Sequence, residues 1–273
     1  MVLDSSSLTL LPTASSSSSL DLASILYGSG TSSGGNPVAA LQTALSSETK
    51  AVAGIANEAS TKRDIAAFRA AVASAKTPAA LLANPVARKV LLTANGLGDQ
   101  ADYAALATKA LLSDTTKTGN LASRLADTRW LSVAKTYDFA NKGLTALTDP
   151  KVLDSLANGY AEVTWRQGLD KATPGLSNAL DFRSRAAGIT TVDQILGDKT
   201  FREVVTVALG LPKQIAFQPL TTQEQAISSR LDLGRLKSAA FVDQLAKRYL
   251  IAAGTAASTG QTGSTQGVAS LFA

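Results

Sequence analysis

Large aromatic side chains recur at close to helical spacing in two stretches of the chain. Trp130, Tyr137 and Phe139 lie in the first stretch, and Phe241 and Tyr249 lie in the second. Side chains that recur once per helical turn share one face of the helix, and an apolar face of this kind is normally buried. The spacing therefore predicts helices whose aromatic residues pack in a core rather than serve a binding site.

Polar residues followed by proline mark where several of these helices begin. Asn36-Pro37 and Asn84-Pro85 each place a capping side chain before a proline at the first helical turn. Proline is tolerated there because the backbone N–H that it lacks would have no partner in the helix. Asp198 is predicted to cap a later helix in the same way.

Glycines mark the corresponding helix ends. Gly96 and Gly210 are predicted C-caps, and Pro212 prevents the second helix from continuing. The segment Thr221–Glu224 has the sequence of a capping box, in which a threonine and a glutamate satisfy each other's free backbone donors. It predicts a further helix start at this point.

The segment Thr148–Pro150 is predicted to open the longest helix of the chain, which would run to about Ala172. Gly159 and Gly168 lie inside this segment. Glycine is a poor helix former, so we expect a break or a kink at one of them.

Part of the chain repeats at a fixed interval. Phe68 and Phe182 are 114 residues apart (182 − 68 = 114), and so are Gly96 and Gly210 (210 − 96 = 114). Further on, Ala134–Tyr137 matches Ala246–Tyr249 at a slightly shorter interval (246 − 134 = 112). The interval is longer than that of stacked solenoid repeats, so it predicts two tandem copies of a small multi-helix module.

Composition divides the chain into four segments. A low-complexity segment rich in serine and glycine covers residues 1–35, the two helical modules cover 36–145 and 146–253, and a tail rich in glycine, threonine and serine covers 254–273. Such tracts bury too little apolar surface to offset the cost of ordering, so we expect both ends to be flexible. Each end contains a short apolar cluster, Leu20–Tyr27 and Val268–Phe272, and could be either a linker or a segment that folds on assembly.

The composition favours an all-α fold and excludes several kinds of site. Apolar residues make up 45% of the chain but aromatic ones only 5%, and much of the rest is alanine, the strongest helix former. The chain has no cysteine, which excludes disulfides and thiolate metal sites, and no histidine, the commonest metal ligand and general base. We therefore expect no enzymatic activity, no metal and no cofactor.

The charge pattern argues against a nucleic-acid partner, and the lack of a long apolar run argues against a membrane span. The net charge is +5, but basic and acidic residues alternate, as they do around Asp127, and this is typical of a solvated helical surface. The first residues lack the positive charge of a secretory signal, and no apolar run approaches the ~18 residues that a membrane span needs. We expect no nucleic-acid partner and no transmembrane segment.

Short matches to catalytic motifs lack their required context. Gly30–Gly34 fits a nucleophile elbow, but that motif needs a strand and a histidine base. Ser132–Lys135 and Lys117–Gly119 fit two motifs of penicillin-recognising enzymes, but in the wrong chain order, so Lys135 is predicted to be a surface lysine. Four aspartates are predicted to lie at helix starts and to complement the helix dipole rather than bind metal: Asp99, Asp102, Asp193 and Asp198.

Four arginines keep their charge in both copies of the repeat and are the candidate site residues. Arg69 corresponds to Arg183, and Arg88 corresponds to Arg202. Each could pair with a helix C-terminus or a carboxylate and stabilise the fold, or it could bind a partner shared by both modules.

Four segments together resemble the bacterial domain of unknown function 1217 family: Asp64–Arg69, Thr77–Leu82, Arg88–Leu97 and Arg124–Ala134. The second copy, Phe182–Leu211 and Leu236–Leu250, is similar to the same module. Members of this family are often encoded among flagellar genes in alphaproteobacteria, and the family has no established catalytic residues. The resemblance therefore implies a role connected with the bacterial flagellum.

These observations lead to a functional expectation with one alternative. We expect a non-enzymatic flagellum-associated protein, either a structural component or an assembly accessory, that contacts flagellar subunits or its own copies and reaches the flagellum or the exterior by flagellar export. The absence of cysteine and of a secretory signal is consistent with such export. The alternative is a cytoplasmic helical adaptor or regulator that bridges two copies of a partner protein.

Overall fold

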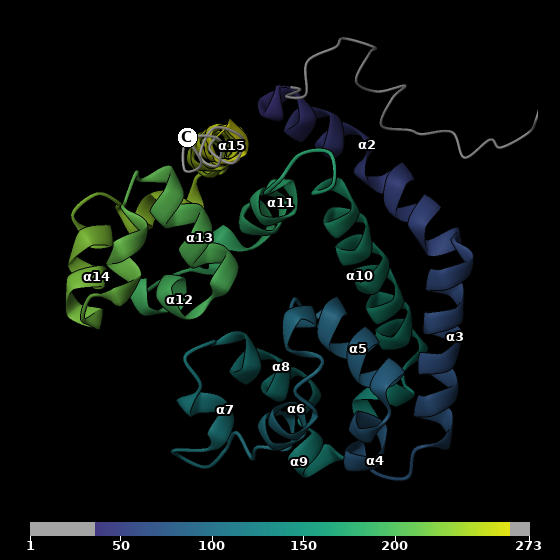
Figure 1. Cartoon of the computed structure of the whole chain (residues 1–273). Helices are drawn as coiled ribbons and strands as arrows, with labels where there is room; N and C mark the ends of the chain where they lie inside the picture. Colours follow the sequence, from purple (N-terminus) through teal and green to yellow (C-terminus); the bar gives the residue numbers. More distant parts are fainter. Residues whose placement is uncertain (1–35, 263–273) are drawn as a thin grey trace, which may run out of the picture. The chain divides into compact units, whose positions relative to one another are not determined.

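The computed structural model describes residues 36–262 of the 273-residue chain, with side-chain surroundings given as far as residue 255. Helices and connecting turns make up this part, which contains no strand (Figure 1), so the all-α prediction is confirmed for it. The predictions made for residues 1–35, including Gly30–Gly34, and for residues 263–273 lie outside the described residues.

The helices of the first half are α2 (Pro37–Asn57), α3 (Ala59–Ser74), α4 (Pro78–Ala83), α5 (Pro85–Ala94), α6 (Ala104–Leu111), α7 (Leu121–Arg124), α8 (Arg129–Tyr137) and α9 (Phe139–Lys142), with 3₁₀ turns η1 (Gly98–Gln100) and η2 (Thr145–Thr148). Those of the second half are α10 (Pro150–Leu169), α11 (Leu176–Arg185), α12 (Val192–Gly197), α13 (Lys199–Ala208), α14 (Leu220–Ser228) and α15 (Ala239–Thr262), with 3₁₀ turns η3 (Ala186–Gly188), η4 (Lys213–Phe217) and η5 (Leu233–Lys237).

The predicted helix starts are confirmed by side-chain caps. The Asn36 side chain accepts hydrogen bonds from the backbone N–H groups of residues 38 and 39, and Asn84 accepts in the same way from residues 86 and 87. Asp198 caps α13 and accepts from the N–H groups of residues 200 and 201. Each cap satisfies backbone donors that the first helical turn cannot pair internally.

The predicted glycine ends are confirmed as well. Gly96 and Gly210 have φ angles of 76° and 65°, in the left-handed region that glycine adopts without a steric penalty. The backbone N–H of Leu97 donates to the carbonyl of Leu92 over 2.8 Å, and that of Leu211 donates to Thr206 over 2.8 Å. Both ends therefore close with the same Schellman hydrogen bond.

The capping box predicted at Thr221–Glu224 is wrong. The box would make Thr222 the first helical residue, but α14 begins two residues earlier, at Leu220, because the carbonyl of Pro219 already accepts from N–H groups of the first turn and no side chain caps it. A capping box occurs instead at the start of α12, where Thr191 and Gln194 satisfy each other's backbone N–H groups.

The predicted longest helix also differs in the structure. Helix α10 starts at Pro150 as expected, but it ends at Leu169 and continues through both of its glycines. Gly159 faces the crossing with α5, where a Cβ atom would lie 3.1 Å from the carbonyl oxygen of Ala94. The longest helix is α15, whose 24 residues reach Thr262. The alanine-rich sequence beyond residue 250 favours helix, so α15 extends past residue 254, and the flexibility expected from that residue on stays a prediction.

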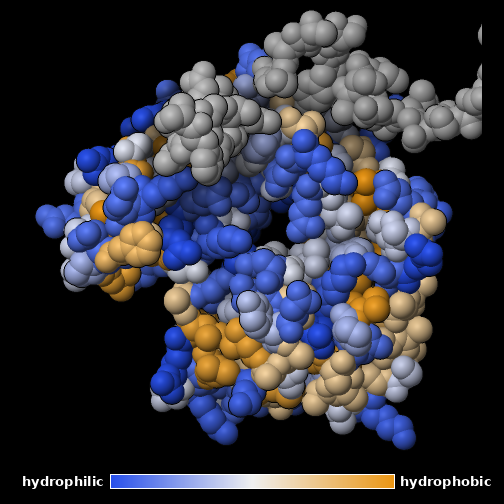
Figure 2. Space-filling model, in the orientation of Figure 1, coloured by the Kyte–Doolittle hydropathy of each residue, from blue (hydrophilic) through white to orange (hydrophobic). Residues whose placement is uncertain are grey.

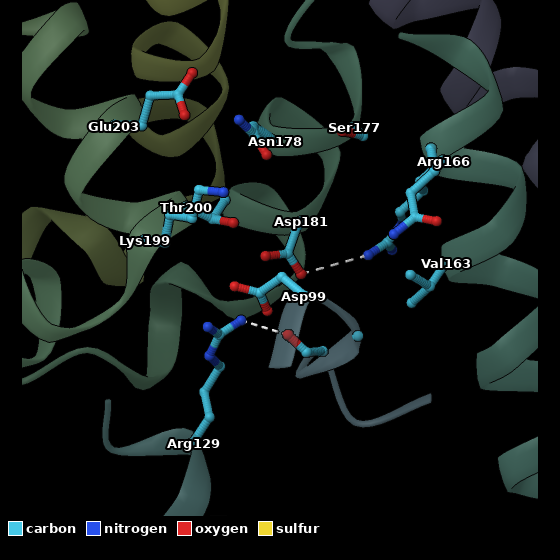
Figure 3. A pocket seen from close by; sticks show the side chains of 13 residues that line it. Asp99, Arg129, Val163, Arg166, Ser177, Asn178, Asp181, Lys199, Thr200 and Glu203 are labelled. Carbon is cyan, nitrogen blue, oxygen red and sulfur yellow. Dashed lines mark hydrogen bonds and ion pairs between the residues drawn. The ribbon is translucent and has the colours of Figure 1, made fainter. Parts of the chain in front are cut away.

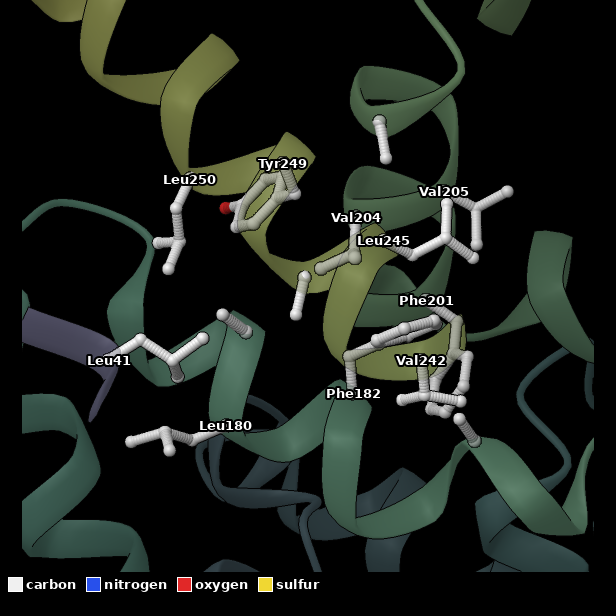
Figure 4. Packing of buried hydrophobic residues seen from close by; sticks show 14 of the residues in the cluster. Leu41, Leu180, Phe182, Phe201, Val204, Val205, Val242, Leu245, Tyr249 and Leu250 are labelled. Atoms are coloured by element: carbon white, nitrogen blue, oxygen red, sulfur yellow. The ribbon is translucent and has the colours of Figure 1, made fainter. Parts of the chain in front are cut away.

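Buried apolar residues form two clusters, which we call the first core and the second core. The first core contains Phe68, Trp130 and Tyr160, and the second contains Phe182, Phe201 and Tyr249 (Figure 4). Helix α10 contributes to both, with Leu156 in the first core and Trp165 in the second.

Helix α2 packs on the second core, although it precedes the residues of the first core in the sequence. Its buried residues Ala40, Leu41 and Ala44 all belong to the second core. The domain boundaries proposed from the sequence stay a prediction, and this contact shows only that the order of packing differs from the order of the chain.

Most of the predicted core aromatics are buried as expected. Trp130, Tyr137, Phe139 and Tyr249 are at most 5% exposed. Phe241 is only partly buried, and the guanidinium carbon of Arg235 lies 3.9 Å from the centre of its ring. It therefore lies at the edge of the second core.

None of the helices between residues 36 and 262 is both long enough and apolar enough to cross a membrane.

Candidate functional site

Arg88 and Arg202, two of the candidate site residues, bind backbone carbonyls. The buried side chain of Arg88 donates from Nη1 to the carbonyl of Leu82 over 2.8 Å and from Nε to that of Ala101 over 2.7 Å. Arg202 donates from Nη1 to the carbonyl of Leu196 over 3.3 Å, and its side chain is exposed. Both arginines thus reach back to the helix that precedes their own.

Arg69 and Arg183, the other two candidates, form ion pairs with two long helices, α10 over the first core and α15 over the second core. Arg69 Nη2 lies 2.7 Å from the Asp154 carboxylate of α10, and Arg183 pairs with Asp243 of α15. The four arginines make separate contacts with different partners, so the structure does not bring them together into one site.

A group of buried and half-buried charges is instead centred on Asp198. We call it the Asp198 cluster, and it consists of Asp127, Arg129, Asp181, Arg185 and Asp198. The Asp198 side chain is 3% exposed, and its Oδ2 atom lies 2.6 Å from Arg185 Nη1 and 3.4 Å from Arg129 Nε. Its Oδ1 atom accepts the two backbone N–H groups that it caps at the start of α13, at 2.9 and 3.1 Å.

The remaining bonds of the cluster complete the pairing of both arginines. Arg129 Nη2 lies 2.6 Å from Asp127 Oδ2, and its Nη1 donates to the carbonyl of Gly96 at the end of α5. Arg185 Nε donates to Asp181 Oδ1 over 2.9 Å. The cluster therefore ties α8 and the end of α5 to α11 and the start of α13.

Burial and pairing act in opposite directions on the pKa values of the cluster. Burial alone would raise the pKa of Asp198, but the hydrogen bond and charge of Arg185 and the charge of Arg129 outweigh it, so the pKa lies below its ordinary value of 3.8. Burial would lower the pKa of Arg185 and of Arg129, but Asp181 and Asp127 reverse this effect and raise both. All three groups are therefore charged at neutral pH.

A cavity of about 210 Å³ opens beside the cluster (Figure 3). Arg129, Arg166 and Lys199 line it together with the carboxylates of Asp99 and Asp181, and Arg166 Nη1 lies 3.8 Å from Asp181 Oδ1. Hydroxyl and amide side chains of Ser177, Asn178 and Thr200 also line the cavity.

The chemistry of this cavity is that of paired charges. Arg166 also pairs with Glu162 and, over 3.5 Å, with Glu48, while its Nε atom is buried with no hydrogen-bond partner in the described part of the chain. Between residues 36 and 255, no group of three or more carboxylates is placed to hold a metal ion. The arrangement can hold helices together by charge and could accept a small ligand with charges of both signs.

The sequence identified only part of this cluster. The sequence predicts Asp198 at a helix cap, as found. It predicts Arg129 and Asp127 on a solvated surface, but their side chains are only 12% and 17% exposed. The alternation of charge around Asp127 does not distinguish a surface from a buried network. Lys135 is exposed as predicted, and Asp99 and Asp193 lie in first turns.

A second pair of polar contacts joins the covering helices to their cores. Tyr160 of α10 donates its hydroxyl to Asp64, and Tyr249 of α15 donates to Glu203 over 2.9 Å. Asn178, which lies 114 residues after Asp64 (178 − 64 = 114), donates to the Tyr249 hydroxyl over 3.3 Å. The hydroxyls of Tyr160 and Tyr249 thus take corresponding partners in the two cores.

These contacts correct one alignment made from the sequence. The sequence pairs Tyr137 with Tyr249, but the Tyr137 hydroxyl bonds to Asn95 instead. Helices α10 and α15 share the sequence Asp-x-Leu-Ala-x-x-Tyr, at residues 154–160 and 243–249. In both helices the aspartate pairs with one of the candidate arginines, and the tyrosine hydroxyl donates to the carboxylate named above. The counterpart of α15 in these contacts is α10, not α8.

The fold is similar to that of a solved protein. A crystal structure of a protein from Agrobacterium tumefaciens matches with a TM-score of 0.68 and 21% sequence identity, over 82% of this chain and 96% of that one. At this level of identity the match shows the fold alone. Among curated proteins, none matches the chain.

The family model described as "Protein of unknown function (DUF1217)" matches residues 94–242. The match runs from the end of α5 to the first turn of α15 and includes every residue of the Asp198 cluster. It covers more than half of the chain, and the chain therefore belongs to the DUF1217 family.

Proposed function

We propose that the chain is a non-enzymatic, flagellum-associated protein, either a structural component or an assembly accessory, and a candidate for export by the flagellar apparatus. Membership of the DUF1217 family supports the flagellar part of the proposal. The observation that supports a role in protein contacts is the exposure of large apolar side chains at the ends of short helical elements. Phe217 is 87% exposed and Leu220 is 56% exposed, and they lie three residues apart, at the end of η4 and at the start of α14. Exposed apolar groups that cluster in this way are typical of protein–protein contact sites.

Exposed apolar residues also occur near the first core. Tyr103, just before α6, is 61% exposed, and Leu121 of α7 is 36% exposed. Figure 2 shows hydrophobic side chains gathered over the lower part of the view, where α6 and α7 lie in Figure 1. Partner subunits could bury apolar surface on both halves of the chain.

Two exposed aromatic residues at corresponding positions of the repeat favour a related candidate function. Tyr103 and Phe217 are separated by the 114-residue interval of the repeat (217 − 103 = 114), and each is an exposed aromatic just before the next helix. We propose that the two halves are copies of one module. An adaptor in the cytoplasm could then use the two aromatics to bridge two copies of a partner protein.

Cell fractionation distinguishes these two functions. We expect an immunoblot of the native bacterium to find the protein with sheared flagella in the wild type and to find it lost from that fraction in a flagellar-export mutant. Flagellin from the same fractions provides the control for shearing and export. Retention of the protein inside the cell in both strains would contradict the flagellar role and support the adaptor.

A further inference from the structure

A groove on the second half of the chain has an apolar floor and a basic rim. It has a volume of about 560 Å³ and lies between α13, η4 and α15. Val207, Ile215 and Ala253 are among its apolar lining residues. We call it the Lys213 groove, after the lysine at its η4 side.

Positive charge on this groove is largely unpaired. Lys199, Arg202 and Lys213 line it, and none of them forms an ion pair within residues 36–255. The one carboxylate in the lining, that of Glu203, accepts the Tyr249 hydroxyl. The groove therefore fits an apolar group that carries negative charge beside it.

The same chain presents a group of this kind on its first half. Tyr103 is 61% exposed, and Asp102 next to it is exposed and forms no ion pair within the described part of the chain. Asp99, one turn earlier, is also exposed, but it lines the cavity beside the Asp198 cluster together with Lys199 and is not counted with this group. We call Asp102 and Tyr103 the Tyr103 corner, which combines an aromatic ring with the carboxylate of Asp102.

We propose that the Tyr103 corner of one molecule inserts into the Lys213 groove of a second copy of this chain. The ring would cover the apolar floor, and Asp102 would face Lys213 and Arg202. The two surfaces are different, so the contact is heterologous, and each copy keeps a free corner or a free groove for the next one. Contacts of this kind build rings or open filaments.

This mode of assembly rests on the proposed structural role and gives it a mechanism. A buried tyrosine contributes 150–250 Å² of contact area, and stable interfaces bury about 1,200–2,000 Å² in total. A single contact is therefore expected to be weak in dilute solution and to weaken further with salt, because exposed charges are screened. Full-length protein at high concentration and low ionic strength gives the best conditions for detecting it.

Sedimentation velocity of the purified full chain tests the proposal. We expect the wild type to form species larger than a dimer as its concentration rises. Tyr103→Ala and Lys213→Glu should each weaken self-association by about 30-fold or more, the effect of losing an interface hot spot. Ile251→Ala is the matched control, because Ile251 is 53% exposed and lies outside both surfaces.

Mixing the two variants gives the decisive result. Tyr103→Ala keeps an intact groove and Lys213→Glu keeps an intact corner, so an equimolar mixture should form a one-to-one dimer and stop there. A wild type that stays monomeric at every concentration, or a mixture without heterodimer, would overturn the proposal. Such a failure would leave the cell-fractionation result unaffected, so the two tests are separate.

Discussion

Replacement of Asp198 by asparagine is expected to lower the free energy of unfolding by about 3 kcal/mol at neutral pH. Asparagine keeps an oxygen that can cap α13 but removes the negative charge that Arg185 and Arg129 share. Loss of one partner of a buried ion pair leaves charge uncompensated and costs about 3–5 kcal/mol. The lower end applies here because Asp181 and Asp127 still pair with the two arginines.

The effect should depend on pH in a defined direction. The pKa of Asp198 is lower in the folded state than its ordinary value of 3.8. Its stabilising contribution is therefore fully present above that value and is lost as the pH falls through the folded pKa. The difference between the wild type and Asp198→Asn should shrink as the pH falls below about 4.

Urea denaturation at several pH values measures both effects. Asp149→Asn is the matched control, because Asp149 caps α10 by the same kind of bond but is exposed and lies in no ion pair between residues 36 and 255. Its substitution should change stability by less than about 1 kcal/mol. An equal loss of stability in both variants would show that the ion pairs add nothing to the cap.

Substitution of Gly197 by alanine should destabilise the protein by about 3 kcal/mol, at the upper end of the cost of overpacking. A Cβ atom at this position would clash with the carbonyl oxygen of Ala126, so the backbone of one segment must move. That movement would also disturb the adjacent Asp127 and Asp198, which hold Arg129 from both sides.

Gly168→Ala in α10 provides the comparison. A Cβ atom there meets no atom within 4 Å, and alanine favours helix, so this variant should be more stable than the wild type by about 0.4–1 kcal/mol. Thermal unfolding of the two variants checks both signs. A Gly197→Ala protein as stable as the wild type would contradict the close approach of the two segments.

The sequence predicts much of the local structure because helix ends depend on neighbouring residues. Asn84 and Gly96 delimit α5 as expected, since a cap and a left-handed glycine act within one turn. The prediction at Thr221 is wrong for the same reason, because Pro219 starts the helix earlier and leaves the threonine inside it.

The candidate site could not be predicted in this way. The Asp198 cluster joins residues 69 positions apart along the chain (198 − 129 = 69), and nothing in the local sequence of Arg129 indicates that it is buried. The match of Tyr137 with Tyr249 fails because similar short segments on α8 and α15 meet different partners. Long-range packing decides both cases.

Photocrosslinking at position 103 in the native bacterium tests most directly the claim that this chain works through protein contacts. A photoreactive phenylalanine analogue replaces Tyr103, and the same analogue at Ile251 is the control. The account predicts a light-dependent adduct at position 103 that joins the chain to another protein in the flagellar fraction, with the mass of two copies if the chain self-assembles. The absence of any adduct at position 103, in cells that contain the full-length protein, would contradict it.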